Sequence, residues 1–361
     1  MKRYLFYLGH PAHFHLFKYT IKELQSKSYP VEIVIKKKDV LENLVQTQGW
    51  DYKNIYPKDR NENKFAILLS LIKKDWELFK IVNQFNPALM IGTSSEITHI
   101  GKIMNIPSVV VNEDDAEAVP LFAKLSYPFA TNILVPSNCS VGRWRKKTIF
   151  YEGYHELAYL HPKRIQLDEY KKEDNKKLFF LRFAKLTAHH DEGKTGITDQ
   201  LALELINKLK QHGNVYISSE RELSKELNTY RTNLPPSEIL SFLSSSDLYI
   251  GDSQTMTAEA AVLGIPSIRF NDFVGKLGYL EELEYKYGLT YGIKTSEPEK
   301  LFQKLDELLS FPNLKEVWQK RRLKMLSDKI DVTSFMLWLI ENYPDSIRMM
   351  NANPDHQYRF K

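Results

Sequence analysis

The sequence contains very little cysteine and no long uncharged apolar run. Cys139 is the only cysteine among 361 residues, so no disulfide can form within the chain and the cytosol is the expected compartment. No segment approaches the roughly 20 apolar residues of a membrane-spanning helix. Met1–Leu8 is too short and too aromatic for a signal peptide and predicts a strand.

An excess of charge of one sign is also missing. The chain has 50 Lys and Arg against 45 Asp and Glu, a formal net charge of +5, which does not indicate a nucleic-acid-binding protein. It is 43% hydrophobic and 26% charged, as in folded globular proteins, and its length predicts two domains.

Apolar segments of strand and helix length alternate along the chain. The pattern predicts strands at 3–8, 31–35, 88–91, 108–111 and 132–135, then at 178–182, 215–218, 248–250, 267–270 and 289–293. It predicts helices at 15–26, 40–48, 64–85 and 95–104, then at 199–211, 236–244, 255–263, 297–309, 314–327 and 334–343. This alternation indicates an α/β protein with parallel sheets covered by helices on both faces.

The alternation restarts after a polar, charged stretch at 161–177. We therefore expect two doubly wound, Rossmann-like domains facing across a cleft, one at 1–165 and the other at 166–347. Residues 348–361 look like a loose tail.

The segment 251–266, GDSQTMTAEAAVLGIP, predicts a turn after a buried strand, a capped helix and the start of another strand. Ser253 or Thr255 can cap the helix, and free amides at a helix N-terminus bind anions such as phosphate. Glu259 lies about one turn further on and could reach the hydroxyls of an attached sugar. The alternative is structural, because capped strand–turn–helix units occur throughout α/β proteins and most bind nothing.

This segment resembles the donor-binding segment of GT-B glycosyltransferases and of non-hydrolysing UDP-sugar 2-epimerases. The resemblance implies that Ser253, Gln254 and Thr255 hold a diphosphate and that Glu259 binds the ribose. The relatives usually carry Ser-Gly at the turn, and Gln254 departs from that pattern. Arg182, after the first strand of the second domain, is suited to the diphosphate charge, as is Lys185.

Three histidines fall within the first strand–helix turn, Gly9–His15. We choose His13 as a general base or phosphate contact, since a neutral imidazole can accept a proton from a sugar hydroxyl. The alternatives are that His10 caps the turn and that His13 or His15 packs in the core. No carboxylate or cysteine spacing supports a metal site here or at 189–192, where His189 and His190 are adjacent.

Two further segments supply candidate catalytic groups. Glu113 and Asp114 lie in an acidic run after a predicted strand, where one carboxyl could have a raised pKa; the alternative is an acidic loop that caps the next helix. His155, within the segment 153–162, is a candidate for an interdomain position, with hinge packing as the alternative. Thr93–Glu96 is expected to cap a helix.

The whole chain resembles a bacterial and archaeal family, domain of unknown function 354, through the blocks 9–13, 153–162, 182–191 and 251–266 in that order. The resemblance implies a GT-B-like architecture, with an N-terminal acceptor and catalytic domain and a C-terminal nucleotide-sugar-binding domain. Fold alone does not fix function.

Three functions remain open. The first is a cytoplasmic glycosyltransferase that uses a nucleotide sugar, most simply a UDP sugar, as substrate without a further cofactor, acting in surface polysaccharide or glycoconjugate synthesis. Its acceptor would be a sugar or a lipid-linked sugar. The others are a sugar-nucleotide 2-epimerase and a non-catalytic nucleotide-sugar-binding protein. The predicted helix at 64–85 mixes apolar residues with lysines, which fits core packing or a peripheral membrane contact.

Overall fold

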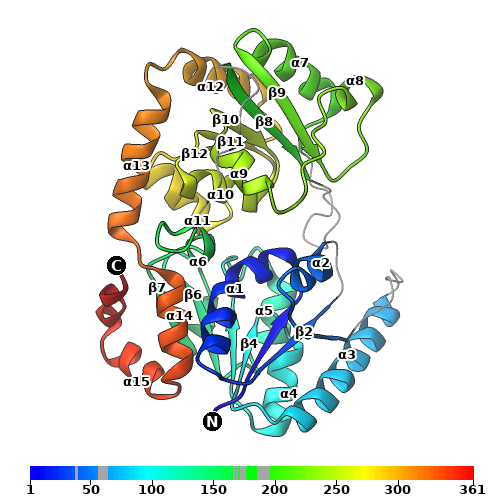
Figure 1. Cartoon of the computed structure of the whole chain (residues 1–361), viewed down its shortest axis with the longest axis vertical. Coiled ribbons are helices and arrows are strands. Elements are labelled where there is room, and N and C mark those ends of the chain that lie inside the picture. Colours follow the sequence, from blue (N-terminus) through cyan, green and yellow to red (C-terminus); the bar gives the residue numbers. More distant parts are fainter. Residues whose placement is uncertain (37–39, 56–63, 166, 168–169, 171–175, 185–195) are drawn as a thin grey trace. The chain divides into compact units, whose positions relative to one another are not determined.

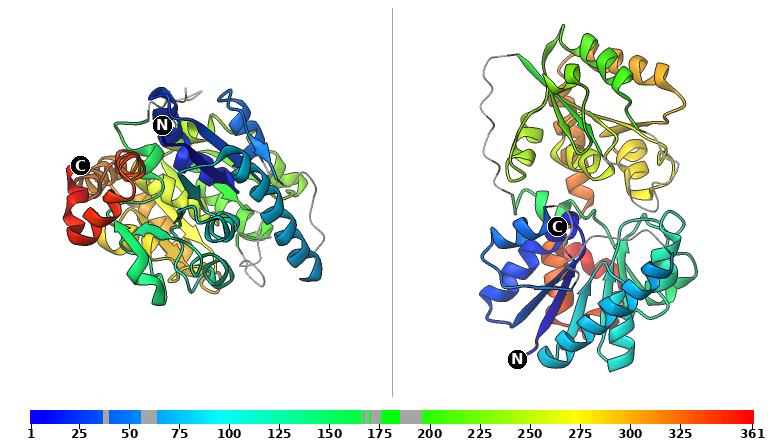
Figure 2. Two further views of the ribbon diagram at one scale, coloured as in Figure 1. Left: turned by 90° about the horizontal axis from the view of Figure 1, so that it is seen from below. Right: turned by 90° about the vertical axis from the view of Figure 1, so that its right-hand side faces the viewer.

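The computed structural model of the chain contains two compact units. Unit 1 comprises Met1–Tyr159 and Lys329–Lys361, and unit 2 comprises Leu160–Asp328. The structure describes residues 1–36, 40–55, 64–165, 167, 170, 176–184 and 196–361, and the described side chains exclude those of 64–71. In each unit, helices cover a sheet on both faces (Figures 1 and 2).

Unit 1 contains a seven-stranded parallel sheet with the order β3-β2-β1-β4-β5-β6-β7. Its strands are β1 (Tyr4–Leu8), β2 (Val31–Ile35), β3 (Lys53–Asn54), β4 (Leu89–Gly92), β5 (Ser108–Val111), β6 (Asn132–Pro136) and β7 (Thr148–Tyr151). Its helices are α1 (Pro11–Ser26), α2 (Leu41–Gln46), α3 (Lys64–Phe85), α4 (Glu96–Met104), α5 (Pro120–Ser126), the 3₁₀ helix η1 (Gly142–Lys147), α6 (Leu157–Leu160, whose last residue lies in unit 2), α14 (Val332–Glu341), α15 (Asp345–Ala352) and the 3₁₀ helix η4 (Pro354–Phe360).

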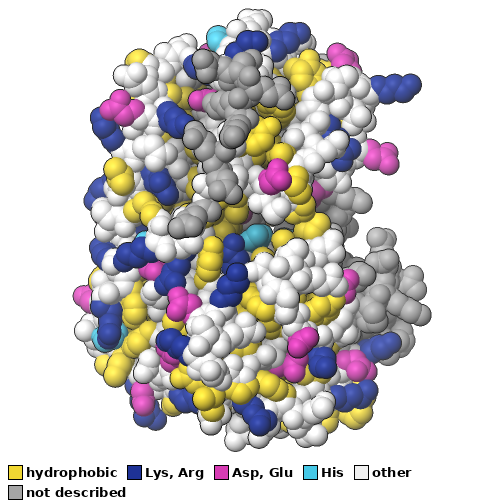
Figure 3. Space-filling view, viewed as in Figure 1, with side chains coloured by type: hydrophobic (Ala, Val, Ile, Leu, Met, Phe, Trp, Pro, Cys, Tyr) yellow, Lys and Arg dark blue, Asp and Glu magenta, His cyan; other side chains and the backbone are white. Residues whose placement is uncertain are grey.

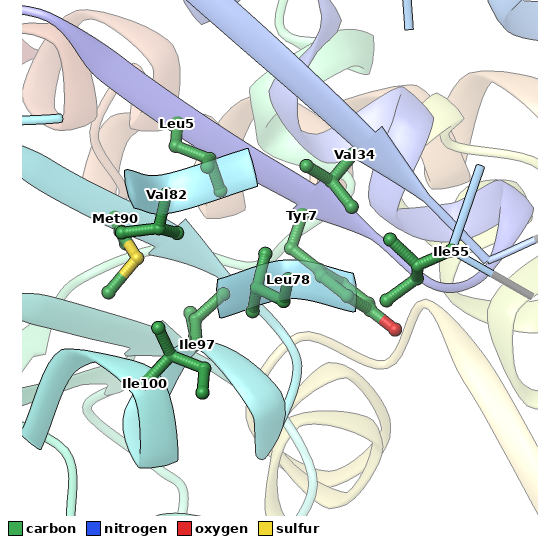
Figure 4. Packing of buried hydrophobic residues seen from close by; sticks show 9 residues of the cluster. All are labelled: Leu5, Tyr7, Val34, Ile55, Leu78, Val82, Met90, Ile97 and Ile100. Atoms are coloured by element: carbon green, nitrogen blue, oxygen red, sulfur yellow. The ribbon is translucent and has the colours of Figure 1, made fainter. Parts of the chain in front are cut away.

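The core of unit 1 explains why β1 is apolar along its whole length. Every residue of β1 is buried, as expected for a central strand with helices on both faces of the sheet. On one face, Tyr7 and Met90 pack against Leu78 and Val82 of α3 and Ile97 of α4 (Figure 4). The apolar stripe of α3 that faces the sheet is therefore core packing, as the sequence allowed.

Unit 2 contains a five-stranded parallel sheet with the order β12-β11-β10-β8-β9. Its strands are β8 (Lys177–Phe183), β9 (Gly213–Ser219), β10 (Leu248–Gly251), β11 (Ser267–Phe270) and β12 (Thr290–Ile293). Its helices are α7 (Asp199–Leu209), α8 (Lys225–Asn228), α9 (Ile239–Ser244), α10 (Gln254–Leu263), α11 (Gly278–Glu281), the π-helical turn η3 (Glu282–Lys286), α12 (Pro298–Ser310) and α13 (Leu314–Asp328).

These two sheets confirm the predicted fold class, α/β with two doubly wound parallel sheets. The observed bounds of β2, β5, β11 and α3 equal the predicted ones. The elements β3, β7 and α5 were not predicted from the sequence. β3 has only two residues, too few to show an apolar pattern, and β7 is a short segment directly after a run of basic residues.

The chain beyond residue 328 belongs to unit 1, which differs from the predicted boundaries at 165 and 347. The Ile330 N–H donates to the Glu152 carbonyl over 2.9 Å, and the Thr333 hydroxyl donates to the Ala158 carbonyl over 2.6 Å. The expected loose tail is also wrong, because residues 345–352 and 354–360 are helical and the buried Gln357 accepts from the Glu152 N–H. These contacts join segments nearly 200 residues apart. The periodicity of apolar residues along the sequence reports only local structure and does not reveal them.

Candidate functional site

In unit 2, the order of strands reverses between β8 and β10, and the predicted donor residues lie at that point. Strands β8, β10, β11 and β12 follow one another to one side, whereas β9 lies on the other side of β8. Arg182 near the end of β8 is paired with Gly251 at the end of β10. Open α/β sheets bind ligands outside the carboxyl ends of the strands at such a reversal.

The turn between β10 and α10 contains the capped, partly exposed start of a helix. Ser253 is the N-cap of α10, and its hydroxyl accepts from the Met256 N–H over 3.4 Å. Ser253, Gln254 and Thr255 are partly exposed, whereas every later residue of the helix is buried. The first amides of a helix have no carbonyl one turn earlier to accept from them. Solvent therefore reaches α10 at the end where these amides lie.

Both ends of α10 are held in place. A Cβ atom at Gly251 would lie 2.9 Å from the Arg182 carbonyl and closer still to the Tyr249 hydroxyl, so the two strand ends approach closely only because residue 251 is glycine. At the other end, Gly264 has a left-handed backbone with φ of 73°. Arg322 of α13 donates to the Val262 carbonyl over 2.8 Å.

Asp252 is a central residue of this turn, although the sequence indicated it only as part of the turn. Its carboxylate accepts from the Ala184 N–H over 2.6 Å and from the Ile197 N–H over 3.3 Å. Asn271, after β11, donates to the Asp252 carbonyl over 2.9 Å. Burial is the main cause that raises the pKa of Asp252 to about 6. The only signal in the sequence was an acidic residue directly after a buried strand.

Two of the predicted ligand-binding residues, Arg182 and Glu259, are held by their surroundings within unit 2. The Arg182 guanidinium donates to the Ser218 hydroxyl over 2.5 Å and forms an ion pair with Glu220, and its Nε is buried without a hydrogen-bond partner among the described residues. Glu259 is buried at 7% exposure within α10. Lys185 and the segment 189–192 lie outside the described residues.

In unit 1, the strand order reverses between β1 and β4, and the histidine turn lies there. His10 is the N-cap of α1, and its Nδ1 accepts from the Ala12 N–H over 3.2 Å. His13 Nδ1 accepts from the Gly9 N–H over 3.1 Å. A neutral imidazole that accepts at Nδ1 carries its proton at Nε2, so His13 presents a donor, which suits a phosphate or hydroxyl contact better than a general base.

His15 follows the packing alternative. Its ring lies 5.2 Å from the ring of Tyr159 and 5.3 Å from that of Phe14. Burial lowers the pKa of His15 to about 3, so the ring is neutral.

The structure brings together Glu113 and His155, two of the predicted catalytic residues. Glu113 follows β5 and His155 follows β7, and His155 Nδ1 lies 3.3 Å from Glu113 Oε2. Burial is the main cause that lowers the pKa of His155 to about 4, and its Nε2 has no hydrogen-bond partner among the described residues. Asp114 is partly buried in the same loop and acts electrostatically on His155.

Neighbouring polar residues hold this loop in place. Asn112 donates to the Asp114 carbonyl over 2.8 Å and to the Tyr127 hydroxyl over 2.9 Å. The buried Cys139 thiol donates to the Glu113 carbonyl over 2.7 Å. Asp115 accepts from the Ser140 N–H. Asp115 therefore holds the loop after β6 and does not cap α5, whose N-cap is Val119, while Glu113 and Asp114 remain candidates.

The segment Thr93–Glu96 lies at the start of α4, where the N-cap residue Ser95 makes no side-chain cap hydrogen bond and the contact comes from Ser94 instead. The Ser94 hydroxyl accepts from the Glu96 N–H over 3.1 Å. The Glu96 carboxylate is buried and lies 2.6 Å from Lys74 Nζ. In the part of the chain that the structure describes, no group of three or more His, Cys, Asp and Glu side chains could hold a metal ion.

A cavity of about 360 Å³ in unit 2 lies apart from these residues, beside the amino ends of β8 and β10. Lys177, Phe179, Asp247 and Leu314 are among its lining residues. The Asp247 carboxylate accepts from the Leu178 N–H over 2.8 Å, so its polar group serves the start of the strand.

The blocks that carry this geometry fall within one family model. The match to "Protein of unknown function (DUF354)" covers residues 6–277, which is more than half of the chain. The chain belongs to the DUF354 family. A comparison with curated proteins finds no match at the level of sequence.

Solved structures share the fold at low sequence identity. UDP-GlcNAc 2-epimerase from Neisseria meningitidis bound to UDP-GlcNAc is 14% identical, with a TM-score of 0.69 over 95% of this chain and 100% of that chain. The glycotransferase of kitacinnamycin is 13% identical, with a TM-score of 0.63 over 94% and 99%. MurG from Acinetobacter baumannii is 13% identical, with a TM-score of 0.63 over 94% and 99%. These matches confirm the GT-B-like fold that the DUF354 chain was expected to have.

Proposed function

We propose that this protein is an enzyme that binds a nucleoside-diphosphate sugar, most simply a UDP sugar, in unit 2 and transfers the sugar to an acceptor. The observation that carries the proposal is the opening of α10 at its first residues, at the point where the strand order reverses. A buried helix that exposes only its N-terminal turn provides a site for a diphosphate.

The donor contacts follow from this geometry. The amides of Gln254 and Thr255 would bind the diphosphate beside the Ser253 cap. Arg182 would exchange its pairing with Glu220 for a pairing with phosphate, because a guanidinium binds phosphate with two parallel hydrogen bonds. Glu259 would accept from the ribose hydroxyls. The nucleotide sugar is a substrate, and the proposed reaction uses no further cofactor.

The acceptor would be activated by groups of unit 1. Glu113 would take the proton from an acceptor hydroxyl, whose oxygen attacks the anomeric carbon as the bond to the diphosphate breaks. The α10 N-terminus and Arg182 would stabilise the charge on the departing diphosphate. Asp114 is the second candidate base. The His155 and Glu113 side chains are 11% and 14% exposed, and His155 Nδ1 lies 3.3 Å from Glu113 Oε2, so we assign His155 the positioning of that carboxylate.

The biological setting follows from this reaction class. A sugar or lipid-linked acceptor would place the protein in surface polysaccharide or glycoconjugate synthesis, at the cytoplasmic side where nucleotide sugars are made. Within the described residues, no helix is long and apolar enough to cross a bilayer.

A 2-epimerase is the second candidate, and one observation favours it. The Neisseria epimerase structure has a TM-score of 0.69, compared with 0.63 for each of the two other proteins named above. An epimerase removes and returns the proton at C2 of the sugar, so it needs an acid and a base. Glu113 and Asp114 together could supply both.

The test incubates the protein with UDP sugars in deuterated water, with and without sugar acceptors, and analyses the products by mass spectrometry. A transferase gives a glycosylated acceptor and UDP, whereas an epimerase incorporates deuterium at C2 without any acceptor. Glu113→Gln should abolish either activity while nucleotide affinity is retained. Nucleotide binding without any product would identify a binding protein and contradict the assignment of catalysis.

The donor site has its own test. Arg182→Gln should weaken UDP binding by about 10- to 100-fold, the range for a charged hydrogen bond. Lys210→Gln is the matched control, because Lys210 is an exposed cation at the end of α7. Equal affinities of the two variants in calorimetry would remove Arg182 from the site.

A further inference from the structure

Large apolar side chains are exposed on the helices α3, α4 and α5 of unit 1 and just after α5. They are between 43% and 71% exposed, and they are Ile72, Trp76, Ile103, Leu121 and Phe129. Single exposed apolar residues are ordinary, but several on neighbouring helices form a patch that indicates an interaction site. We call these five residues the apolar patch.

His99 of α4 shows that the apolar patch belongs to one face. Its Nδ1 lies 2.9 Å from Asp75 of α3, and its Nε2 lies 2.9 Å from the Leu125 carbonyl of α5. Its ring lies 5.3 Å from the ring of Phe129. Ile72 is one turn before both Asp75 and Trp76, Ile103 is one turn after His99 and Leu121 is one turn before Leu125. α3 and α4 run side by side at the edge of unit 1 (Figure 2).

Exposed cations surround the apolar patch. On the three helices they are Lys73, Lys80, Lys102 and Lys124. The helix η1 adds Arg143, Arg145 and Lys146, and Lys147 at its end donates to the Pro128 and Ala130 carbonyls on either side of Phe129.

The acidic side chains of these helices are engaged within unit 1. Glu96 pairs with Lys74 over 2.6 Å, Asp75 with His99 over 2.9 Å and Glu77 with Lys80 over 3.0 Å. Glu117, in the loop before α5, is exposed and accepts from the Ser140 hydroxyl over 3.2 Å. The face as a whole is positive.

Over the face drawn in Figure 3, Lys and Arg side chains are scattered among Asp and Glu side chains. The chain has a net charge of only +5 in total. Seven exposed cations around one apolar patch are therefore a local feature rather than a property of the whole surface.

We propose that this face of unit 1 docks on a bilayer that contains anionic phospholipid. Lysines and arginines interspersed with Trp, Phe, Leu and Ile are typical of surfaces that lie in the headgroup region, where the apolar groups enter the acyl boundary and the cations meet phosphate. Trp76 stacks on Phe79 with ring centroids 5.6 Å apart, so a rigid aromatic pair stands at the patch. The charge complementarity favours an anionic membrane over a neutral one. This inference does not depend on the proposed reaction.

The experiment is flotation of the full chain with phosphatidylcholine vesicles, with and without phosphatidylglycerol. The expected result is binding only to the anionic vesicles, weakened by salt. Two double variants should each lower the partition coefficient by at least about tenfold. One is Lys102→Glu with Lys124→Glu, since each basic residue contributes about fivefold. The other is Trp76→Ser with Phe129→Ser, which removes two apolar side chains from the acyl boundary. All four residues are exposed, so circular dichroism and thermal unfolding should match the wild type.

The matched control is Leu323→Ser with Lys315→Glu, an exposed apolar residue and an exposed lysine of unit 2. The control should bind as the wild type does. Absence of binding to anionic vesicles, or equal loss in the control and in the patch variants, would overturn the proposal. Self-association in sedimentation velocity that Trp76→Ser abolishes, without vesicle binding, would identify the patch as a contact between copies of the chain and would also overturn it.

Discussion

Replacing Asp252 with asparagine provides a quantitative test of how the candidate donor turn is built. The Asp252 carboxylate holds the chain on both sides of residues 185–195, because it accepts from the Ala184 and Ile197 N–H groups. Burial raises its pKa from 3.8 to about 6, so the folded protein binds this proton more tightly than the unfolded chain does. The stability that this proton contributes is present in full below about pH 4 and is lost as the pH rises through 6.

The size of this effect follows from the difference between the two pKa values. A pKa that differs by 1 between the folded and the unfolded chain corresponds to about 1.36 kcal/mol. The free energy of unfolding therefore falls by at most about 3 kcal/mol between those limits. The amide that replaces the carboxyl would be neutral at every pH and would lose one acceptor, which is a constant cost. The difference in unfolding free energy between the wild type and Asp252→Asn should therefore change with pH, in favour of the wild type as the pH is lowered.

The assay is urea unfolding of both proteins at several pH values from about 3 to 8, a range that includes both pKa values, 3.8 and about 6. Hydrogen exchange of peptides from 248–270 reads unit 2 separately from unit 1. Other titrating groups are common to both proteins and cancel in the difference. A difference that is the same at every pH would refute the burial of a titrating carboxyl in this turn.

Two further predictions concern the strand ends. Gly251→Ala should unfold unit 2 or lower its free energy of unfolding by several kcal/mol, roughly the range for overpacking, because the added Cβ would meet the Arg182 carbonyl and the Tyr249 hydroxyl; a variant with an unchanged melting temperature would contradict the close approach. For His155, the pKa lowered from 6.5 to about 4 means that stability of unit 1 is lost as the pH falls through this range, by at most about 3 kcal/mol. His155→Gln should flatten that dependence in urea unfolding, and an unaltered profile would show that the imidazole is not buried.

The sequence predicted the two doubly wound units because alternation of apolar strands and amphipathic helices is a local signal. Segments such as Val31–Ile35 are short, apolar and bounded by polar residues, so their bounds could be read directly. The order of strands in each sheet could not be read, because it depends on packing between distant segments. That order places Arg182 beside Gly251 and therefore decides which turns share an edge.

The site residues also divide into those that a local sequence pattern predicts and those whose role depends on distant parts of the chain. Ser253 or Thr255 was predicted as a cap because the cap is a local pattern, and the structure shows that Ser253 is the cap. Asp252 was missed because its partners at 184 and 197 are more than 50 residues away. His13 was chosen as a base or phosphate contact without knowledge of its surroundings, since only the folded chain shows that it accepts from Gly9 and that His15 lies near two aromatic rings.

The most direct test of the central claim is hydrogen exchange of the protein with UDP, GDP, CDP and TDP, read at peptides that resolve the amides of 253–256. We expect at least one nucleotide to slow exchange at Gln254 and Thr255, and Glu259→Gln to weaken this effect without changing exchange in the free protein. Slowed exchange at other segments only, or no effect of any nucleotide, would contradict the assignment of α10 as the diphosphate site.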